Sequence, residues 1–409
     1  MIYFEYMKAE SELNPSGGIS SPGGFRAGAT SAGIKYGNQG ALDLCMLHSE
    51  VPCTAAAMFT TNMVKAAPVI LCQQRLKEGK ISALVVNSGY ANACTGKQGM
   101  ADALEMTVLT AKHLGIAPEE VLVASTGVIG VPLPMERIRT GIPKVVLYAD
   151  GGHDLARAIM TTDTVPKEVS VRDSEATFTI GGVAKGSGMV HPDMATLLCF
   201  LTTDAKIEAA FLKQALQEAV AVSFNMVSID GDTSTNDMVL IMANGLAGGG
   251  VIMQGSREAE VFQQALNQAC VFLARAIARD GEGATRLIEV TVSGAASIAD
   301  ARLVARTIVS SPLVKAAVHG CDPNWGRILA AAGRSRAKLI PERLELSIGE
   351  ICMVKNGCPV SFDEEQVVKS LGCDEVSIAV DLNVGSAEAI AWGCDLSEEY
   401  VTINSDYTT

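Results

Sequence analysis

The chain has 409 residues, of which 48% are hydrophobic and 19% charged, a composition typical of a folded protein with a large core and not of a disordered chain. Its 32 basic and 45 acidic residues give a net charge of −13, which disfavours nucleic acid or an anionic membrane as a partner. No apolar run approaches the roughly 18 residues of a membrane helix. The first residues lack the features of a secretory signal, so we expect a cytoplasmic protein.

The cysteine and histidine content bears on metal sites and redox state. Eleven cysteines are scattered without a Cys-x-x-Cys pair, and the five histidines lack paired spacing. We therefore expect reduced, mostly buried thiols and no bound metal. The sequence also lacks a Gly-x-Gly-x-x-Gly loop and a phosphate loop ending in Gly-Lys-Ser/Thr, so no nucleotide-type cofactor is predicted.

Helical elements can be predicted from apolar spacing. Residues 15–24 are rich in glycine, serine and proline and predict an exposed lead-in. Apolar residues at intervals of three and four then mark three helices, through residues 100–111, 207–215 and 262–277. Gly115 is the expected end of the first helix, Asp204 the expected cap of the second, and the third should end before Gly281.

Two segments near the end of the chain have the alternation of half-buried strands. Residues 376–384 alternate apolar side chains with small or polar ones, and residues 288–292 do the same. Helices and strands are thus interspersed along the chain, which predicts a mixed α/β fold.

Residues 181–204 form the segment of greatest chemical interest. Glycines surround Lys185, and Pro192 with Asp193 predicts a tight bend. The run from 197 to 201 is wholly apolar and is bounded by Thr-Thr-Asp, which favours a short buried strand. Thr196 is therefore predicted to lie at the mouth of a buried strand, directly after an irregular loop.

A threonine in that place could be a nucleophile. Its hydroxyl needs a nearby base, and a free α-amine on the same residue, with a pKa of about 7.7–8.0, is close to ideal near neutral pH. Thr196 is internal, so this chemistry requires cleavage of the Ala195–Thr196 bond, and the small side chain of Ala195 leaves room for the attack. From local sequence alone, an ordinary strand threonine remains the alternative.

Two other residue patterns suggest functional sites and can be weighed against this one. The run that begins at Asp230 resembles the start of a calcium loop, but Thr235 occupies the sixth position, where glycine is required, and Ile241 the twelfth, where glutamate is required. We reject a calcium site there. His191 lies five residues before Thr196 and suggests a Thr–His pair, but an amine base would make it unnecessary.

The motifs around Thr196 carry a family resemblance. Lys185-Gly186-Ser187-Gly188-Met189, Pro192 and Met194-Ala195-Thr196-Leu197-Leu198 closely resemble the cleavage motif of the ornithine acetyltransferase family, also called bifunctional glutamate N-acetyltransferase. Further blocks resemble the same family in the same order: Phe25–Ala27, Asn87–Gly96, Ser125–Gly130, Met160–Thr164, Asp230–Asp237, Asp280–Thr285, Asp322–Arg327 and Ala391–Leu396. Together they extend from about residue 25 to the end.

The resemblance implies a fold and an assembly. It implies a four-layer α-β-β-α sandwich with a smaller second lobe, in a self-cleaving enzyme with an N-terminal threonine. The chain would be divided into an α part, residues 1–195, and a β part, residues 196–409. Two α and two β parts would form a heterotetramer.

The resemblance also implies roles for individual residues. Thr196 would be the nucleophile, and Thr126 with Gly127 would form the oxyanion hole, for which a hydroxyl and a backbone N–H are suitable donors. Substrate would be contacted by Lys185, Glu282, Asn404, Thr409 and one of Thr161 or Thr162, of which spacing favours Thr162. Without the resemblance, Lys185 and Glu282 would be interpreted as solvated surface charges.

The implied activity moves an acetyl group from N-acetylornithine to glutamate in arginine biosynthesis, through an acetyl ester on Thr196 and without a cofactor. Whether acetyl-CoA is a second donor is left open. Two alternatives are a self-cleaved amidase or aminopeptidase of similar fold, with water as acceptor, and a non-catalytic binding protein that keeps the fold without cleavage.

Overall fold

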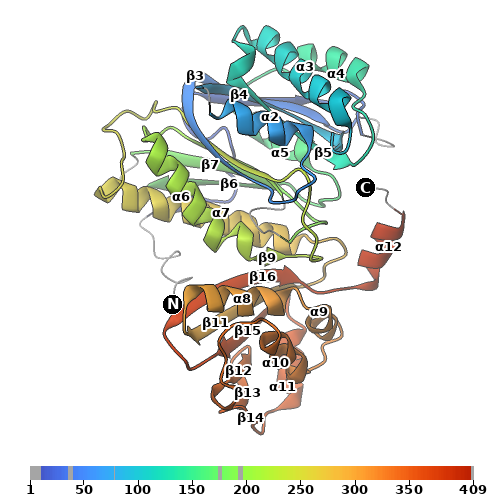
Figure 1. Cartoon of the computed structure of the whole chain (residues 1–409), viewed down its shortest axis with the longest axis vertical. Coiled ribbons are helices and arrows are strands. Elements are labelled where there is room, and N and C mark those ends of the chain that lie inside the picture. Colours follow the sequence, from blue (N-terminus) through green and yellow to red (C-terminus); the bar gives the residue numbers. More distant parts are fainter. Residues whose placement is uncertain (1–10, 36–39, 78, 174–176, 192–196, 407–409) are drawn as a thin grey trace.

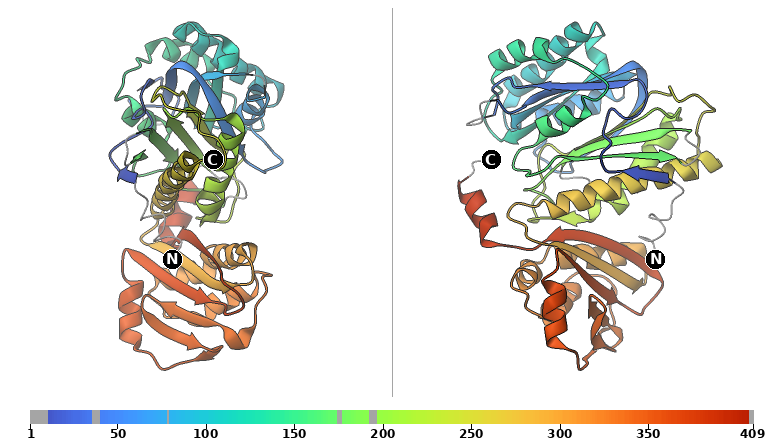
Figure 2. Two further views of the ribbon diagram at one scale, coloured as in Figure 1. Left: turned by 90° about the vertical axis from the view of Figure 1, so that its left-hand side faces the viewer. Right: turned by 180° about the vertical axis from the view of Figure 1, so that it is seen from behind.

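The computed structural model describes residues 11–35, 40–77, 79–173, 177–191 and 197–406, which form a larger and a smaller lobe (Figures 1 and 2). In these ranges the larger lobe holds a nine-stranded sheet. Its strands follow one another in space as β1 (Ser11–Asn14), β6 (Lys167–Asp173), β7 (Thr179–Lys185), β8 (Leu198–Thr203), β10 (Met238–Ala243), β3 (Leu44–Phe59), β4 (Ile81–Tyr90) and β5 (Val121–Val128), with β2 (Phe25–Thr30) also paired to β3.

Strand β3 is long enough to belong to two halves of this sheet. Its residues 54–59 pair with β10, while its residues 44–49 pair with β2 on one side, and residues 44–48 pair with β4 on the other. Side chains from both halves, among them Phe200, Leu240, Leu44 and Val85, share one buried cluster. The two halves therefore pack against each other around a common core, with α5 (Gly152–Ile159) contributing Leu155 and neighbouring residues to it.

Helices cover the outer faces of both halves. Helices α2 (Ala67–Arg75) and α3 (Gly96–Leu114) pack on β5, and α4 (Met135–Gly141) packs beside α3. On the opposite side α7 (Arg257–Arg279) packs on β6 and β7, next to α6 (Ala209–Val222). Helix, sheet, sheet and helix layers follow one another, so the implied four-layer sandwich is confirmed.

The smaller lobe is built on a second sheet, which the described residues form from seven strands. In spatial order these are β14 (Cys358–Pro359), β13 (Ile351–Lys355), β12 (Glu345–Ile348), β15 (Glu375–Asp381), β11 (Leu287–Ala295), β16 (Ala387–Cys394) and β9 (Val227–Ser228). Its helices are α8 (Ile298–Val309), α9 (Pro312–His319), α10 (Trp325–Gly333) and α11 (Glu364–Leu371), and α12 (Glu398–Asp406) follows the lobe.

The two lobes share a core. Helix α8 packs on β11 and β16, while α7 of the larger lobe contacts β16 and β9. One buried cluster consequently runs from Phe211 and Phe262 in the larger lobe to Val290 and Ile378 in the smaller one. Burying such a continuous apolar surface makes the lobes one packed body rather than two loosely tethered units.

The strands around residue 197 are interleaved in the sheet. Strands β8 and β10 lie between β7 and β3, although β7 and β3 both precede residue 192 in the sequence. Strand β8 pairs antiparallel with β7 and parallel with β10, and β10 pairs antiparallel with β3. The sheet is thus continuous only because chain from both sides of residues 192–196 contributes to its centre.

Most of the predicted elements are confirmed. Helix α3 contains residues 100–111 and ends at Gly115, whose φ of 73° is a left-handed cap that favours glycine. Helix α7 ends at Arg279, before Gly281. Strand β15 alternates exposed and buried residues, β11 contains residues 288–292, and β8 is buried throughout its length.

Two predictions are wrong. Asp204 does not cap a helix, because α6 begins at Ala209; the Asp204 carboxylate instead accepts hydrogen bonds from the backbone N–H groups of Thr179 (2.7 Å) and Gly23 (3.0 Å). The lead-in is also partly buried: residues 17–19 are covered, and Ile19 is fully inaccessible. A Cβ at Gly181 would lie 2.3 Å from the Gly18 carbonyl oxygen, so glycine lets this segment run against β7.

All eleven cysteines fall in the described ranges and are unpaired, six of them buried. None of the helices in the described part of the chain is both long and apolar enough to cross a membrane.

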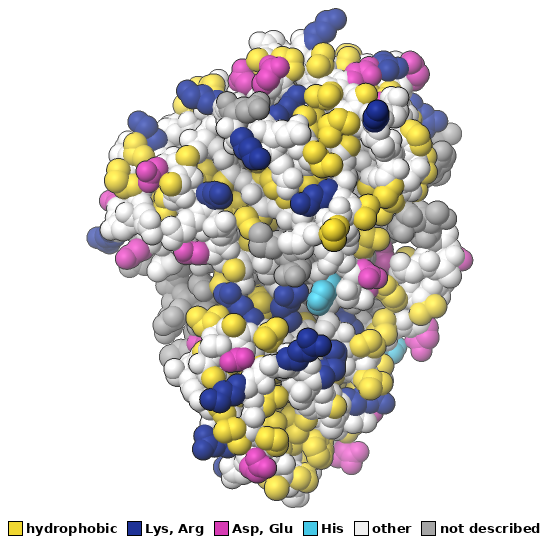
Figure 3. All heavy atoms as spheres, viewed as in Figure 1, with side chains coloured by type: hydrophobic (Ala, Val, Ile, Leu, Met, Phe, Trp, Pro, Cys, Tyr) yellow, Lys and Arg dark blue, Asp and Glu magenta, His cyan; other side chains and the backbone are white. Residues whose placement is uncertain are grey.

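Residues 298–340 carry seven basic and two acidic residues. Basic side chains gather over this part of the smaller lobe in Figure 3, in contrast to the negative charge of the whole chain.

Candidate active site

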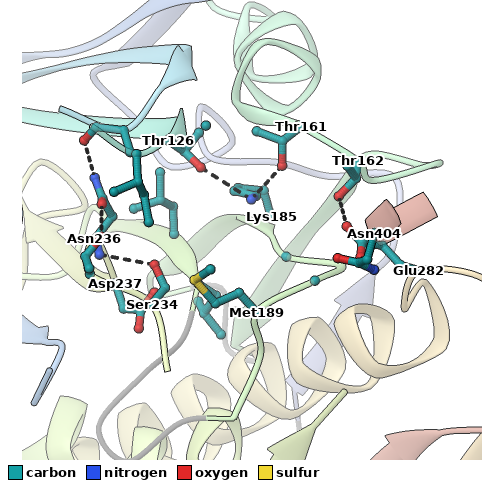
Figure 4. Close-up of a pocket in the computed structure, with 18 residues that line it drawn as sticks. Thr126, Thr161, Thr162, Lys185, Met189, Ser234, Asn236, Asp237, Glu282 and Asn404 are labelled. Atoms are coloured by element: carbon teal, nitrogen blue, oxygen red, sulfur yellow. Dashed lines mark hydrogen bonds between the residues drawn. The ribbon is translucent and has the colours of Figure 1, made fainter. Parts of the chain in front are cut away.

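A pocket of about 100 Å³ lies where the ends of β5 and β7 meet the chain after α7. Seven residues that the sequence analysis assigned to a site line it: Thr126, Gly127, Thr161, Thr162, Lys185, Glu282 and Asn404 (Figure 4). Leu197, the residue after the predicted nucleophile, also lines it. Ala195, Thr196 and Thr409 lie outside the described residues.

Thr126 and Gly127 are near the end of β5, beside β4. Gly127 has a φ of 126°, and a Cβ on it would lie 2.3 Å from the carbonyl carbon of Gly89. Only glycine can adopt this conformation so close to a neighbouring backbone. The ladder between β4 and β5 becomes irregular at the same place. The chain therefore departs from regular pairing where it lines the pocket.

Lys185 ends β7 and points into the pocket (Figure 4). Its ammonium group donates to the hydroxyl of Thr161 at 2.8 Å and lies 3.4 Å from the hydroxyl of Thr126. The side chain is only 9% exposed, and burial lowers the pKa of Lys185, with Lys167 acting in the same direction and Asp163 opposing it. Lys185 is thus a buried cation and not a solvated surface charge.

Asp163 balances the charge of this end of the pocket. Its carboxylate accepts from Lys167 at 2.7 Å and from the backbone N–H of Gly186 at 2.8 Å, and Lys167 is shared with Asp280 at 2.6 Å. Burial would raise the pKa of Asp163, but the charges of Lys167 and Lys185 outweigh it and hold the pKa well below its usual range. A fixed negative charge therefore sits behind Lys185.

Glu282 forms the opposite end of the pocket. Its carboxylate accepts from the hydroxyl of Thr162 at 2.6 Å and from the side-chain amide of Asn404 at 2.8 Å. A Cβ on Gly188 would come within 2.5 Å of that carboxylate, so a glycine at this position of the motif lets Glu282 approach. Both threonines of the 161–162 pair consequently line the pocket, Thr161 against Lys185 and Thr162 against Glu282.

The sequence analysis missed the contribution of residues 234–237. All four line the pocket, and the side-chain amide of Asn236 donates to the carbonyl oxygens of Ala91 (2.6 Å) and Ser125 (2.8 Å). Asn236 thereby ties the start of β10 to the end of β5. The residue pattern from Asp230 suggests a calcium loop, which is rejected, and the resemblance of Asp230–Asp237 to a family block is the one sequence signal of a site there.

His191 lies away from this arrangement. Its Nδ1 is 3.0 Å from the hydroxyl oxygen of Ser228, and its Nε2 is 3.4 Å from the guanidinium of Arg306 on α8. Arginine can only donate, so Nε2 accepts and Nδ1 carries the proton. Among the described residues, those that line the pocket do not include His191.

A buried lysine beside two hydroxyls at one end, and a buried carboxylate at the other, form a cavity in which polar groups converge, as they do in sites that bind small molecules. With the layered mixed α/β fold, this arrangement defines an enzyme that acts on a small-molecule substrate.

Comparison with known proteins gives the family. The profile of the ArgJ family matches residues 26–409, so the chain belongs to the ArgJ family, and the family identified from the motifs is confirmed. An arginine biosynthesis bifunctional protein ArgJ from Symbiobacterium thermophilum is 54% identical over 398 residues, 96% of this chain and 99% of the relative. The protein of that name from Dehalococcoides mccartyi is 51% identical over 405 residues, 98% of this chain and 100% of the relative. A crystal structure of ornithine acetyltransferase complexed with ornithine, from Mycobacterium tuberculosis, is 44% identical and covers 45% of this chain and 100% of its own, with a TM-score of 0.43.

Proposed function

We propose that this protein transfers an acetyl group from N-acetylornithine to glutamate in arginine biosynthesis, through an acetyl ester on Thr196. The observation that carries the proposal is that family membership and pocket geometry agree. Seven of the residues that the family resemblance singles out, from β5, β7, the 161–162 pair, the chain after α7 and α12, line one pocket.

The first step is self-cleavage between Ala195 and Thr196. The Thr196 hydroxyl attacks the Ala195 carbonyl, and the peptide bond is exchanged for an ester. Water then hydrolyses this ester, which leaves a carboxylate on Ala195 and a free α-amine on Thr196. That amine has a pKa suited to a general base near neutral pH. Leu197 on the pocket wall supports the placement of the new terminus beside the substrate.

The second step is acetyl transfer. The Thr196 amine takes the proton of the hydroxyl, the oxygen attacks the acetyl carbonyl of N-acetylornithine, and ornithine leaves as the amine. Glutamate then attacks the acetyl ester and takes the acetyl group as N-acetylglutamate. Each tetrahedral intermediate carries an oxyanion, for which Thr126 and the Gly127 N–H are the proposed donors.

Lys185 has a specific part in this scheme. An ammonium group can only donate, so the Thr126 oxygen accepts from Lys185 in the contact of 3.4 Å. The hydroxyl proton of Thr126 is then free to point at the oxyanion. The positive charge also makes that hydroxyl a better donor, because a hydrogen-bonded chain is polarised along its length.

The opposite charges of Lys185 and Glu282 suit the two ends of an α-amino acid. N-acetylornithine and glutamate are of similar length, so one pocket can hold them in turn. The proposal extends to a cytoplasmic assembly of two α and two β parts. Size-exclusion chromatography with light scattering would test the mass of this assembly.

The test is to incubate the purified protein with N-acetylornithine alone and record intact masses. Cleavage gives fragments of 195 and 409 − 195 = 214 residues, and the larger should gain the mass of one acetyl group as ornithine appears. Addition of glutamate should discharge it as N-acetylglutamate. Release of free acetate instead would identify an amidase, and an uncleaved chain without activity would identify a binding protein.

A further inference from the structure

The loop between β9 and β10 holds the chain that precedes residue 192. The backbone N–H of Ile229 donates to the Val190 carbonyl at 2.7 Å, and the hydroxyl of Thr233 donates to the His191 carbonyl at 2.8 Å. Ser228 contacts the His191 ring. These contacts fasten two consecutive residues, 190 and 191, immediately before the segment that contains the proposed scissile bond.

Asp230 is the centre of this loop. Its Oδ2 accepts from the backbone N–H of Met189 at 2.5 Å, and its Oδ1 accepts from those of Val190 at 2.8 Å and Asp232 at 3.2 Å. One carboxylate therefore binds two successive amides of the Lys185–His191 segment, a geometry that needs both of its oxygens. Hydrogen bonds to an ionised carboxylate are roughly twice as strong as those between neutral groups.

The chain after residue 196 is fixed as well. The Leu197 carbonyl accepts from the backbone N–H of Met238 at 2.9 Å, and β8 is paired on both edges from Leu198 onward. The Thr196 hydroxyl can attack the preceding carbonyl only if the chain before the scissile bond and the chain after it are held in suitable relative positions. A misplacement of about 1 Å costs on the order of 10² in the rate of such a reaction.

We propose that Asp230 is a positioning residue for self-cleavage, which fixes the segment before the scissile bond. The inference rests on the proposed cleavage at Ala195–Thr196. Asp230 makes no covalent bond and transfers no proton in this step. It holds the chain before the scissile bond in place, while Met238 and the sheet hold the chain after it.

The test follows cleavage in the full-length Asp230→Asn variant. Asparagine keeps one acceptor oxygen but places an NH₂ donor against a backbone N–H, so one of the two segment contacts is lost. After pulse synthesis, a denaturing gel should show that the uncleaved chain disappears roughly 10- to 100-fold more slowly than in the parent. The cleaved fraction, once isolated, should keep a kcat near the parent value.

Two further variants make the result specific. Asp232→Asn changes an exposed carboxylate two residues away that accepts no hydrogen bond from the described residues, and it should cleave at the parent rate. Asp230→Glu keeps both acceptor oxygens and should recover part of the cleavage rate.

Several outcomes would overturn the proposal. Cleavage of Asp230→Asn at the parent rate would do so directly. Equally slow cleavage of Asp230→Asn and Asp230→Glu, with the same drop in thermal stability in both, would indicate a general folding defect. If the parent chain itself is not cut at residue 195, the proposed function fails, and that result is distinct because it appears without any substitution.

Discussion

The two ends of the pocket differ in how they are built. The Lys185 end lies on strands β5 and β7 inside the sandwich, and Lys185 and Thr126 are each 9% exposed. At the other end Glu282 is held by Asn404 from α12, a helix without a buried residue in its described span. Figures 1 and 2 show α12 beside the junction of the lobes, outside both layered bodies.

This difference separates two tasks. Groups on packed strands are held to within a fraction of an ångström, which suits stabilisation of a transition state. A helix attached mainly by polar contacts has the low local stability expected of an element that adjusts to substrate. We therefore expect substitutions at the Lys185 end to act on kcat, and substitutions at the α12 end to act on KM.

The largest expected effect is at Thr196, the proposed nucleophile. Thr196→Ala should abolish both self-cleavage and acetyl transfer, because alanine has no hydroxyl, whereas Thr196→Ser should retain part of each. Intact mass and an assay for N-acetylglutamate measure the two properties separately. Acetyl transfer by the alanine variant at a rate near that of the parent would show that Thr196 is not the nucleophile.

The next largest effect is expected at Thr126, the proposed oxyanion donor on β5. Thr126→Ala should lower kcat by about 10²–10³ with a smaller change in KM, because the hydroxyl would act mainly on charge that develops during the reaction. Steady-state kinetics with N-acetylornithine and glutamate give both constants. A change confined to KM would assign Thr126 to binding, and the contrast between the two ends would disappear.

Lys185 should give a smaller effect with its own pH signature. Lys185→Met should reduce kcat/KM roughly 10- to 150-fold, from the loss of hydrogen bonds that involve a charged group, while Lys167 still pairs with Asp163. Because burial lowers the pKa of Lys185, the parent enzyme should lose activity on the alkaline side below the usual lysine value of about 10.4. This alkaline decline should be absent in the variant; its persistence would assign it to another group.

The smallest effect is expected at α12. Asn404→Ala removes one donor to the Glu282 carboxylate from an exposed helix, so KM should rise roughly twelvefold, corresponding to about 1.5 kcal/mol, the lower end for a hydrogen bond to a charged group, with kcat nearly unchanged. Thr402→Ala, on the same exposed helix and bonded only locally to Glu398, is the matched control. A fall in kcat as large as that of Thr126→Ala would mean that both ends take part in the transition state.

Local patterns predicted the elements whose burial follows a period. Helix α7 and strand β15 have one apolar face, and their sequence pattern alone identifies the face that is covered. In α3 the apolar spacing predicts the helix but not its buried face, because Leu104 and Val108 are exposed while Met106 is buried. The partial burial of the lead-in could not be predicted in this way, because it depends on the close approach of Gly181 to Gly18, 163 residues earlier in the chain. A glycine-rich sequence indicates a backbone with many accessible conformations, but it does not identify the distant segment that packs against it.

The site shows the same limit more sharply. Composition and periodicity do not tell which distant segments meet, so only the family resemblance gathered Thr126, Lys185 and Glu282 into one site. Even the resemblance implies no role for Asp163 and Lys167, the buried pair behind Lys185. Charged residues are usually exposed, and a sequence does not reveal the partner that makes the burial of a charge tolerable.

The interleaved order of β7, β8, β10 and β3 has a consequence for the proposed mature enzyme. If the chain is cut after Ala195, the α part supplies β7 and β3 and the β part supplies the two strands between them. The folded state then consists of two polypeptides, while unfolding releases them as independent molecules. Its melting temperature should rise with protein concentration, and refolding should follow second-order kinetics. Each uncut Thr196→Ala chain, in contrast, carries all four strands itself, so cleavage would convert the folding of each protomer from a unimolecular into a bimolecular reaction.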